Sequence, residues 1–473
     1  MKKGSVAMMA AAGAGAAIRR ASDDTDRMVS DLQRLIRQPS VSATGEGLEE
    51  CAGMVCEMLA DAGLEADILR LGRKGRQGAA PPVVYAERIS KSNPKKTLLF
   101  YNHYDVQPAE PLDMWRDPPF AGVRRGNRVY GRGAIDDKGE LAARLLAVGS
   151  YIRETGDVPC SVKFVIEGEE ETGSGHMHQY ISKYRKRFAC DGVIWEFGYV
   201  NPDGRPVVGL GMKGLMFVEL TARGPVRDAH SSLAVLIRNP AWRLIEALGS
   251  MRMPDGTITI QDWHDGMQWF DELELGLLNA EPFDEERFKR EFGIKSFVGD
   301  SSGLEAKAAL AGDPTFNIAG MASGHTGSGA KTVLPATATV KLDIRLAPGM
   351  EPARQFERLQ AHLARNGFAV DISARMLYGE AAARTDPREQ IVAHVEDAAR
   401  RSFRAEPVLS VSNSGTGPMH AFRNGLGVPC VSIGGTYIYS RIHSPNEFAR
   451  IDLLKKTAAC MCRIMANLGR APQ

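Results

Sequence analysis

Short apolar runs alternate with amphipathic segments along the first two hundred residues, and this alternation constrains the fold most. Residues 97–106 (TLLFYNHYDV) and 161–167 (SVKFVIE) are rich in β-branched and aromatic residues, and leucines recur at helical spacing between them, from Lys138 to Glu154. A third short run, 192–196 (GVIWE), extends the pattern. Strands separated by helices are typical of α/β folds with a substantially parallel sheet. The sequence therefore predicts an α/β fold here.

A different pattern begins near residue 211. The segments 212–225 and 336–349 alternate apolar and polar residues, each precedes a helical segment, and a third strand is expected at 368–377. Such alternation is typical of antiparallel strands with one open face. A long stretch before residue 336 reads as irregular. After residue 385 the first pattern returns, so the sequence predicts a smaller α+β domain inserted into a larger α/β domain.

These patterns divide the chain of 473 residues, which is too long for one hydrophobic core. We expect an N-terminal extension over 1–21, a larger domain in two parts, 22–210 and 385–473, and an inserted domain over 211–384. The extension is rich in Ala, Gly and Met and faintly resembles a signal peptide, but it contains almost no Leu, Ile or Phe. We expect a frayed or helical segment there.

Charge and cysteine content exclude several classes of protein. The formal net charge is +2, and no basic stripe or aromatic platform suggests nucleic-acid binding. No run of 18 apolar residues suggests a membrane span. The seven cysteines form an odd, scattered set that is typical of reduced thiols. These features predict a cytoplasmic protein that binds neither nucleic acid nor membrane.

Acidic and imidazole side chains occur where the predicted strands end. They are His103 and Asp105, the run EGEEE (167–171), and Glu196, with Asp136 and Asp137 just ahead of a predicted helix. Singly, each has an ordinary explanation: a structural histidine, a solvated acidic loop, or a helix cap. Carboxyl ends of parallel strands meet at one edge, however, and four packed carboxylates repel unless a cation neutralises them. Mixed histidine and carboxylate ligands predict zinc or a similar divalent ion.

Seven motifs make the chain resemble the co-catalytic zinc peptidases, the family of carboxypeptidase G, carnosinase, aminoacylase and succinyl-diaminopimelate desuccinylase. They are HYDVQP (103–108), GRGAIDDKG (131–139), EGEEETGS (167–174), DAHSS (228–232), SGAKTVLP (328–335), DIRLAPGM (343–350) and HSPNE (443–447). The first two most resemble the carnosinase-like dipeptidase branch. The resemblance implies a catalytic domain with a mixed, largely parallel sheet and an inserted α+β dimerisation or lid domain.

The resemblance also implies two divalent metal ions, zinc or else manganese or cobalt. The implied ligands are His103 and Glu196 for the first metal, Glu171 and His443 for the second, and Asp136 as the bridge between them. Asp105 would orient the His103 ring, and Glu170 would be the general base. A cis peptide is implied between Asp136 and Asp137.

Four further residues are implied to contact the substrate. His230, Thr332 and Arg345 lie in the predicted inserted domain, and Thr416 lies in a loop after it. In family dimers the histidine reaches the partner's active site and stabilises the oxyanion, so a homodimer is implied. Arg345 would bind the substrate carboxylate as a bidentate guanidinium.

Two departures leave the substrate open. Glu196 stands where many dipeptidases carry Asp, and residues 378–384 (YGEAAAR) lack the H-G-x-K-P-W segment usual in the carnosinase branch. The leading hypothesis is a dipeptidase or carboxypeptidase-like amide hydrolase, and the alternative is an N-acyl-amino-acid deacylase. An inactive binding or scaffold relative would usually lack a ligand or the base, whereas this chain keeps them all.

Overall fold

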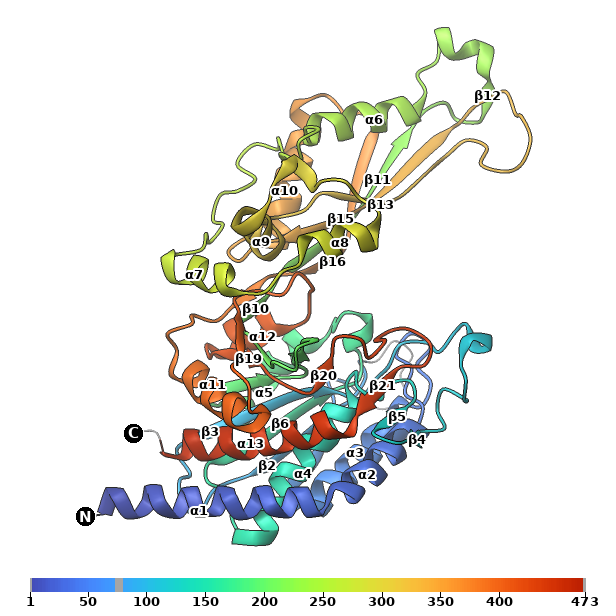
Figure 1. The fold of residues 1–473 in the computed structure, drawn as a ribbon. Helices are drawn as coiled ribbons and strands as arrows, with labels where there is room; N and C mark the ends of the chain where they lie inside the picture. Colours follow the sequence, from blue (N-terminus) through green and yellow to red (C-terminus); the bar gives the residue numbers. More distant parts are fainter. Residues whose placement is uncertain (1, 73–79, 471–473) are drawn as a thin grey trace. The chain divides into compact units, whose positions relative to one another are not determined.

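The computed structural model describes residues 2–72 and 80–470, which form two compact units (Figure 1). The first unit contains the described residues up to Gly211, then Thr385–Val411 and the chain from Gly417 onward. The second contains Met212–Arg384 and Ser412–Thr416. The loop Ser412–Thr416 lies outside the insertion that the sequence predicts, yet it packs with the second unit.

An eight-stranded mixed sheet forms the centre of the first unit. Its order is β1 (Glu65–Leu69), β2 (Val83–Arg88), β6 (Ser161–Glu167), β3 (Thr97–His103), β7 (Gly192–Trp195), β19 (Cys430–Ser432), β9 (Val207–Gly209) and β18 (Val408–Ser410). The neighbours β6–β3, β3–β7, β7–β19 and β9–β18 are parallel, and the other three pairs are antiparallel. The predicted α/β class with a mixed, largely parallel sheet is confirmed.

Helices cover both faces of this sheet because its central strands are apolar on both sides. The helices of the unit are α1 (Lys2–Asp23), α2 (Thr25–Arg37), α3 (Leu48–Asp61), α4 (Lys138–Thr155), α5 (Met177–Phe188), α11 (Gln390–Phe403), α12 (Met419–Leu426) and α13 (Ile451–Arg470). On β3, the Phe100 ring lies 5.6 Å from the Arg144 guanidinium of α4. The next residue, Tyr101, faces the other way and lies 4.8 Å from the Phe422 ring of α12.

The N-terminal segment is helical and packs against the first unit. Helix α1 contacts α4 and α13, and its Ala14, Ala17 and Ala21 side chains are buried. Small side chains at this spacing form one narrow face, which lets the helix approach its neighbours closely. No helix within residues 2–72 and 80–470 is long and apolar enough to cross a membrane.

The second unit is built on a four-stranded antiparallel sheet. Its order is β13 (Asn317–Ser323), β15 (Thr337–Leu346), β11 (Gly214–Arg223) and β16 (Ile372–Glu380). Helices α6 (Pro240–Met251) and α10 (Pro352–Arg365) pack on one face. Alternate residues of β11 from Met216 to Ala222 are buried there, and those between them are half-exposed, as the alternating sequence predicts.

The expectation of a long irregular stretch before residue 336 is wrong. The structure contains α7 (Glu272–Ala280), α8 (Glu285–Phe292), α9 (Gly303–Gly312) and strand β13 there. The three helices are short and bury few apolar residues, so they carry little helical periodicity. Strand β13 is an exposed edge strand with no apolar alternation, and only its pairing with β15 makes it a strand.

Candidate metal centre

The predicted site residues of the first unit follow three neighbouring parallel strands. β3 ends at His103, which pairs in register with Glu167, the last residue of β6. β7 ends at Trp195, directly before Glu196. The carboxyl ends of these strands therefore lie at one edge of the sheet, where α/β folds bind ligands. The 3₁₀ turn Glu170–Thr172 follows β6 at the same edge.

Asp136 lies between two imidazoles at this edge. Its Oδ1 is 3.1 Å from Nε2 of His103, and its Oδ2 is 3.0 Å from Nε2 of His443. The same His443 nitrogen lies 3.0 Å from Oε2 of Glu171. One ligand atom from each of Asp136, Glu171 and His443 lies within 4.8 Å of the other two. Within the described ranges, this is the one group of three or more His, Cys, Asp or Glu side chains that meets this criterion. The peptide between Asp136 and Asp137 is cis, as the resemblance implied.

Glu196 lies outside that three-residue group. Its side chain is buried, and its Oε1 accepts a hydrogen bond of 3.1 Å from the indole nitrogen of Trp195. Its Oε2 is buried with no hydrogen-bond partner among the described residues. A buried carboxylate oxygen without a partner is costly unless a cation or another group satisfies it.

Asp105 supports both the His103 imidazole and the turn that carries the acidic residues. Nδ1 of His103 lies 3.0 Å from the backbone carbonyl of Asp105 and 3.4 Å from its Oδ1, so the main chain and the carboxylate of Asp105 both contact the imidazole. The Asp105 carboxylate also accepts hydrogen bonds from the backbone nitrogens of Glu170, at 3.2 Å, and Glu171, at 3.0 Å. One buried carboxylate therefore positions residues from two segments.

The sequence analysis assigned no role to Gln107, although it lies in the first motif. Its backbone nitrogen donates to Oε1 of Glu171 at 3.2 Å, and its side-chain amide donates to Oε2 at 3.0 Å. Gln107 thus orients a predicted ligand. Its position in the first motif, four residues after the predicted ligand His103, was the one sequence signal that could have suggested this role.

Arg144 connects the carboxyl-terminal parts of β3 and β7 through hydrogen bonds. This buried guanidinium donates hydrogen bonds of 2.7 Å to the backbone carbonyls of Tyr101 and Glu196. Asp137 completes the support, because its carboxylate accepts from the backbone nitrogen of His103 and from the Asn102 amide. These contacts hold the ends of β3 and β7 in place.

The electrostatics of the cluster fit a divalent cation. Burial, reinforced by the carboxylates of Glu171 and Asp136, raises the pKa of Glu170 to about 8. Burial and Glu170 raise the pKa of Glu196 well above its usual range. Hydrogen bonds to Asp136 and Glu171 raise the pKa of His443 to about 10. A divalent cation between these groups would favour the charged carboxylates and neutral imidazoles that bind metal, so the donor set suits zinc or a similar ion.

The structure places the four predicted substrate-binding residues in two pairs within the second unit. Nε2 of His230 lies 3.4 Å from Oγ1 of Thr332, and both residues are exposed. His230 is in β12 (Ala229–His230), which pairs with β14 (Val333–Leu334), and Thr332 directly precedes β14. Nη1 of Arg345 donates a hydrogen bond of 2.8 Å to Oγ1 of Thr416.

Strand β15 separates the two pairs. Arg345 lies near one end of this strand, and the His230–Thr332 pair lies beyond Thr337 at the other end, at the tip of the second unit (Figure 1). Eight residues of strand span roughly 27 Å. One copy of the chain therefore cannot place both pairs on the same small substrate.

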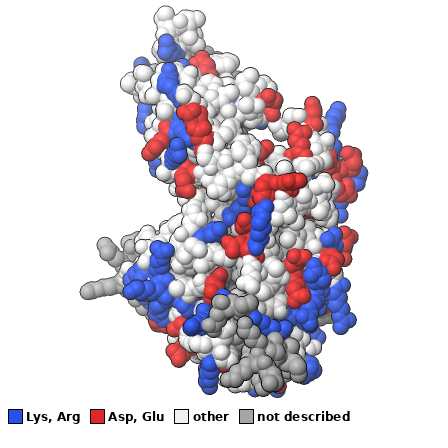
Figure 2. Space-filling view, turned by 90° about the vertical axis from the view of Figure 1, so that its left-hand side faces the viewer, with Lys and Arg blue, Asp and Glu red and all other residues white. Residues whose placement is uncertain are grey.

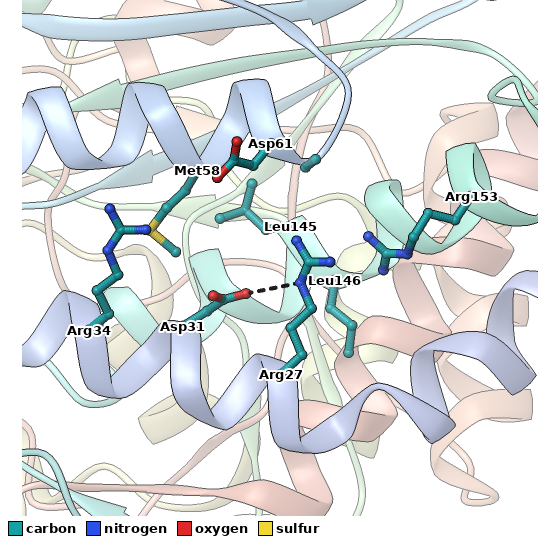
Figure 3. A pocket seen from close by; sticks show the side chains of 9 residues that line it. Arg27, Asp31, Arg34, Met58, Asp61, Leu145, Leu146 and Arg153 are labelled. Carbon is teal, nitrogen blue, oxygen red and sulfur yellow. Dashed lines mark ion pairs between the residues drawn. The ribbon is translucent and has the colours of Figure 1, made fainter.

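A small cavity in the first unit has a different character (Figure 3). It measures about 30 Å³ and lies between α2, α3 and α4, and Arg27 and Asp31, both on α2, form an ion pair of 3.8 Å beside it. The charged lining residues are Arg27, Arg34, Arg153, Asp31 and Asp61. This volume holds a water molecule or two, and no predicted site residue lines it. On the face shown in Figure 2, basic and acidic side chains are likewise interspersed.

Comparison with known proteins identifies the family. Residues 99–467 match the family described as Peptidase family M20/M25/M40. The chain belongs to this family. The resemblance to co-catalytic zinc peptidases is confirmed, and the M20/M25/M40 chain is a hydrolase of the metallopeptidase class.

Three relatives illustrate the similarity. The Cys-Gly metallodipeptidase dug1 of Schizosaccharomyces pombe is 31% identical over 347 residues, covering 71% of this chain and 72% of that protein. The Beta-Ala-His dipeptidase of Homo sapiens is 29% identical over 292 residues, covering 61% of this chain and 57% of that protein. The crystal structure of the M20 family metallo-carboxypeptidase Sso-CP2 from Sulfolobus solfataricus is 35% identical, with a TM-score of 0.85, and the match covers 93% of this chain and 99% of that one.

Proposed function

We propose that this M20/M25/M40 chain uses two divalent metal ions, zinc in the first instance, to hydrolyse an amide bond next to a free carboxylate in a small peptide. The observation that carries the proposal is Asp136, whose two carboxylate oxygens contact His103 and His443 separately. Asp136 would therefore be the ligand common to both ions. His103 and Glu196 would hold the first ion, and Glu171 and His443 the second.

The metal ions supply two kinds of chemistry when bound: they polarise the scissile carbonyl and lower the pKa of a water molecule. The residues of the chain supply the rest. Asp105 keeps the His103 ring oriented, and Gln107 keeps the Glu171 carboxylate oriented. Burial of His103, Asp105 and Glu196 would keep bulk water away from the ligands of the first ion.

Glu170 would move the proton during hydrolysis. It is held beside the cluster by its backbone hydrogen bond to Asp105. Its carboxylate would accept a proton from the attacking water and deliver it to the leaving nitrogen. Burial and the neighbouring carboxylates raise its pKa, which makes it a stronger base, and a bound cation would keep it ionised.

Substrate binding would involve the second unit and a second copy of the chain. Arg345, held by Thr416, would bind the substrate carboxylate. His230 lies at the opposite end of β15 from Arg345, so the histidine that stabilises the oxyanion would come from a partner subunit. We therefore propose that the chain forms a homodimer and that the inserted segment, residues 211–384, contributes to dimerisation.

Two substrate classes, unblocked peptides and N-acyl amino acids, are to be distinguished by experiment. The relatives are named as a Cys-Gly dipeptidase, a Beta-Ala-His dipeptidase and a metallo-carboxypeptidase, which supports unblocked peptides. The test is a screen of dipeptides, longer peptides, and N-acetyl or N-succinyl amino acids, with metal content measured in the same samples. We expect the unblocked peptides to be turned over faster. A preference for the acylated series would instead establish an N-acyl-amino-acid deacylase.

A cytoplasmic location completes the proposal. All seven cysteines are free thiols, and five of them are buried. Burial raises the pKa of Cys160, Cys460 and Cys462, which keeps these thiols protonated and unreactive. Free buried thiols are typical of proteins in a reducing compartment.

A further inference from the structure

The two segments that bring Asp136 and His443 together are both irregular. Asp136 lies in the turn segment 131–137, and His443 lies in a loop between β20 (Thr436–Tyr437) and β21 (Phe448–Arg450). In that loop Arg441, His443 and Asn446 have φ angles of 60°, 57° and 64°. Side chains other than glycine rarely adopt this region, so surrounding contacts must impose it.

Glu447 makes the contacts that join the loop to the turn. Its side chain is fully buried, and its Oε1 accepts hydrogen bonds from the backbone nitrogens of Ile135, at 3.0 Å, and Asp136, at 3.3 Å. Its Oε2 accepts from the backbone nitrogen of Gly133 at 3.0 Å and from Nη1 of Arg132 at 2.8 Å. One carboxylate therefore receives four donors from a turn that lies more than 300 residues earlier in the chain.

The backbone and Arg132 reinforce this connection. The carbonyl of Glu447 accepts a hydrogen bond of 3.1 Å from the backbone nitrogen of Gly131. Arg132, itself 2% exposed, also donates to the carbonyl of Pro108 at 3.1 Å. Glu447 is thus surrounded by donors and has no solvent to replace them.

We propose that Glu447 is a positioning residue for metal binding: its carboxylate sets the separation of Asp136 and His443, which lies four residues before it. This inference rests on the proposed metal-dependent function. Only a carboxylate suits the position, because each of its oxygens accepts from two N–H donors. Glutamine would direct its own amide hydrogens at two of those donors, which would push the turn and the loop apart.

The test is the retention of zinc by full-length protein during titration with a competing chelator. In Glu447→Gln we expect roughly 10–100-fold weaker retention of the zinc held with His443, the usual effect of losing a group that orients metal ligands. We also expect kcat to fall and to recover partly when zinc is added in excess, because the ligands themselves remain. Cobalt substitution should show an altered d–d spectrum.

Asp157→Asn is the matched control. The Asp157 carboxylate also joins distant segments, since it accepts from the backbone nitrogens of Lys91, at 3.0 Å, and Ser92, at 3.1 Å. It lies just before β6 begins, at the opposite edge of the sheet from the metal ligands. We expect this variant to lower thermal stability while zinc retention and the cobalt spectrum stay at wild-type values.

The outcomes distinguish a failure of the positioning role of Glu447 from a failure of the proposed metal-dependent function. Wild-type zinc retention and spectrum in folded Glu447→Gln would overturn the positioning role. If that variant does not fold, Arg132→Lys provides the same test, because lysine keeps the positive charge but cannot reach both Glu447 and Pro108. Weaker zinc retention in Arg132→Lys would support the positioning role of Glu447, and unchanged zinc retention would overturn it. A wild-type protein that holds no metal would overturn the proposed function itself, and this inference with it.

Discussion

The candidate metal centre of the first unit and the proposed substrate-binding residues of the second unit differ in how they are held. His103, Asp105 and Glu196 are at most 1% exposed, and backbone groups from several segments support the cluster, although the side chain of His443 is 51% exposed. His230 and Thr332 are exposed and contact each other through a single side-chain pair of 3.4 Å. Metal ligands need preorganisation before the ion binds, whereas substrate contacts must stay accessible until the substrate or a partner subunit arrives.

The largest effect should come from Glu170, the proposed general base in the first unit. Replacing Glu170 with Ala should lower kcat by roughly 10²–10⁴-fold, because the carboxylate proposed to move the water proton is removed. Metal content, measured by mass spectrometry on the same sample, should not change, since Glu170 is not a ligand. Near-normal turnover in this variant would contradict the mechanism.

His230→Ala tests whether the second unit acts across a dimer. We expect a loss of roughly 10²–10³-fold in kcat, the usual effect of removing an oxyanion donor. Mixing this variant with Glu170→Ala under conditions of subunit exchange should restore activity to about one quarter of wild type, because half the dimers are mixed and each has one complete site. No recovery in exchanged dimers, or full activity of a monomer, would remove this role for His230.

Arg345 should affect substrate binding more than turnover. Replacing it with Ala removes a charged hydrogen bond worth about 1.5–3 kcal/mol, so KM should rise roughly 10–150-fold for substrates with a free carboxylate. The KM of Arg345→Lys should lie between those of the wild type and Arg345→Ala, because lysine keeps the charge but not the bidentate geometry. Substrates amidated at the carboxyl end provide the control, since their KM should be insensitive to either change.

The smallest effect should come from Thr416, whose hydroxyl accepts from Arg345 and donates to the backbone carbonyl of Lys213 at 2.8 Å. Thr416→Val keeps the shape and removes both hydrogen bonds, but neither would be made to the substrate itself, so KM should rise roughly 2–10-fold with kcat unchanged. Combining it with Arg345→Ala should add little, because the two side chains act together. Additive effects would show that Thr416 acts independently of Arg345.

Local sequence determined much of the secondary structure and the identity of the candidate ligands. The helical segments predicted after the two alternating strands are α6 and α10, which begin at Pro240 and Pro352, because proline suits the first turn of a helix. His103 and Glu196 could be selected because each stands at the end of an apolar strand, and strand ends in one parallel sheet converge. These inferences need only near neighbours along the chain.

Tertiary structure alone decided which distant groups meet. Strand β13 has no alternation of its own and forms only by pairing with β15. The sequence could place Glu447 in a motif, but its four donors come from a turn over 300 residues away. The separation of His230 from Arg345 likewise follows from their positions on either end of β15. Hydrogen-bond partners and distances across a sheet depend on the packed chain as a whole, which local patterns of residues do not specify.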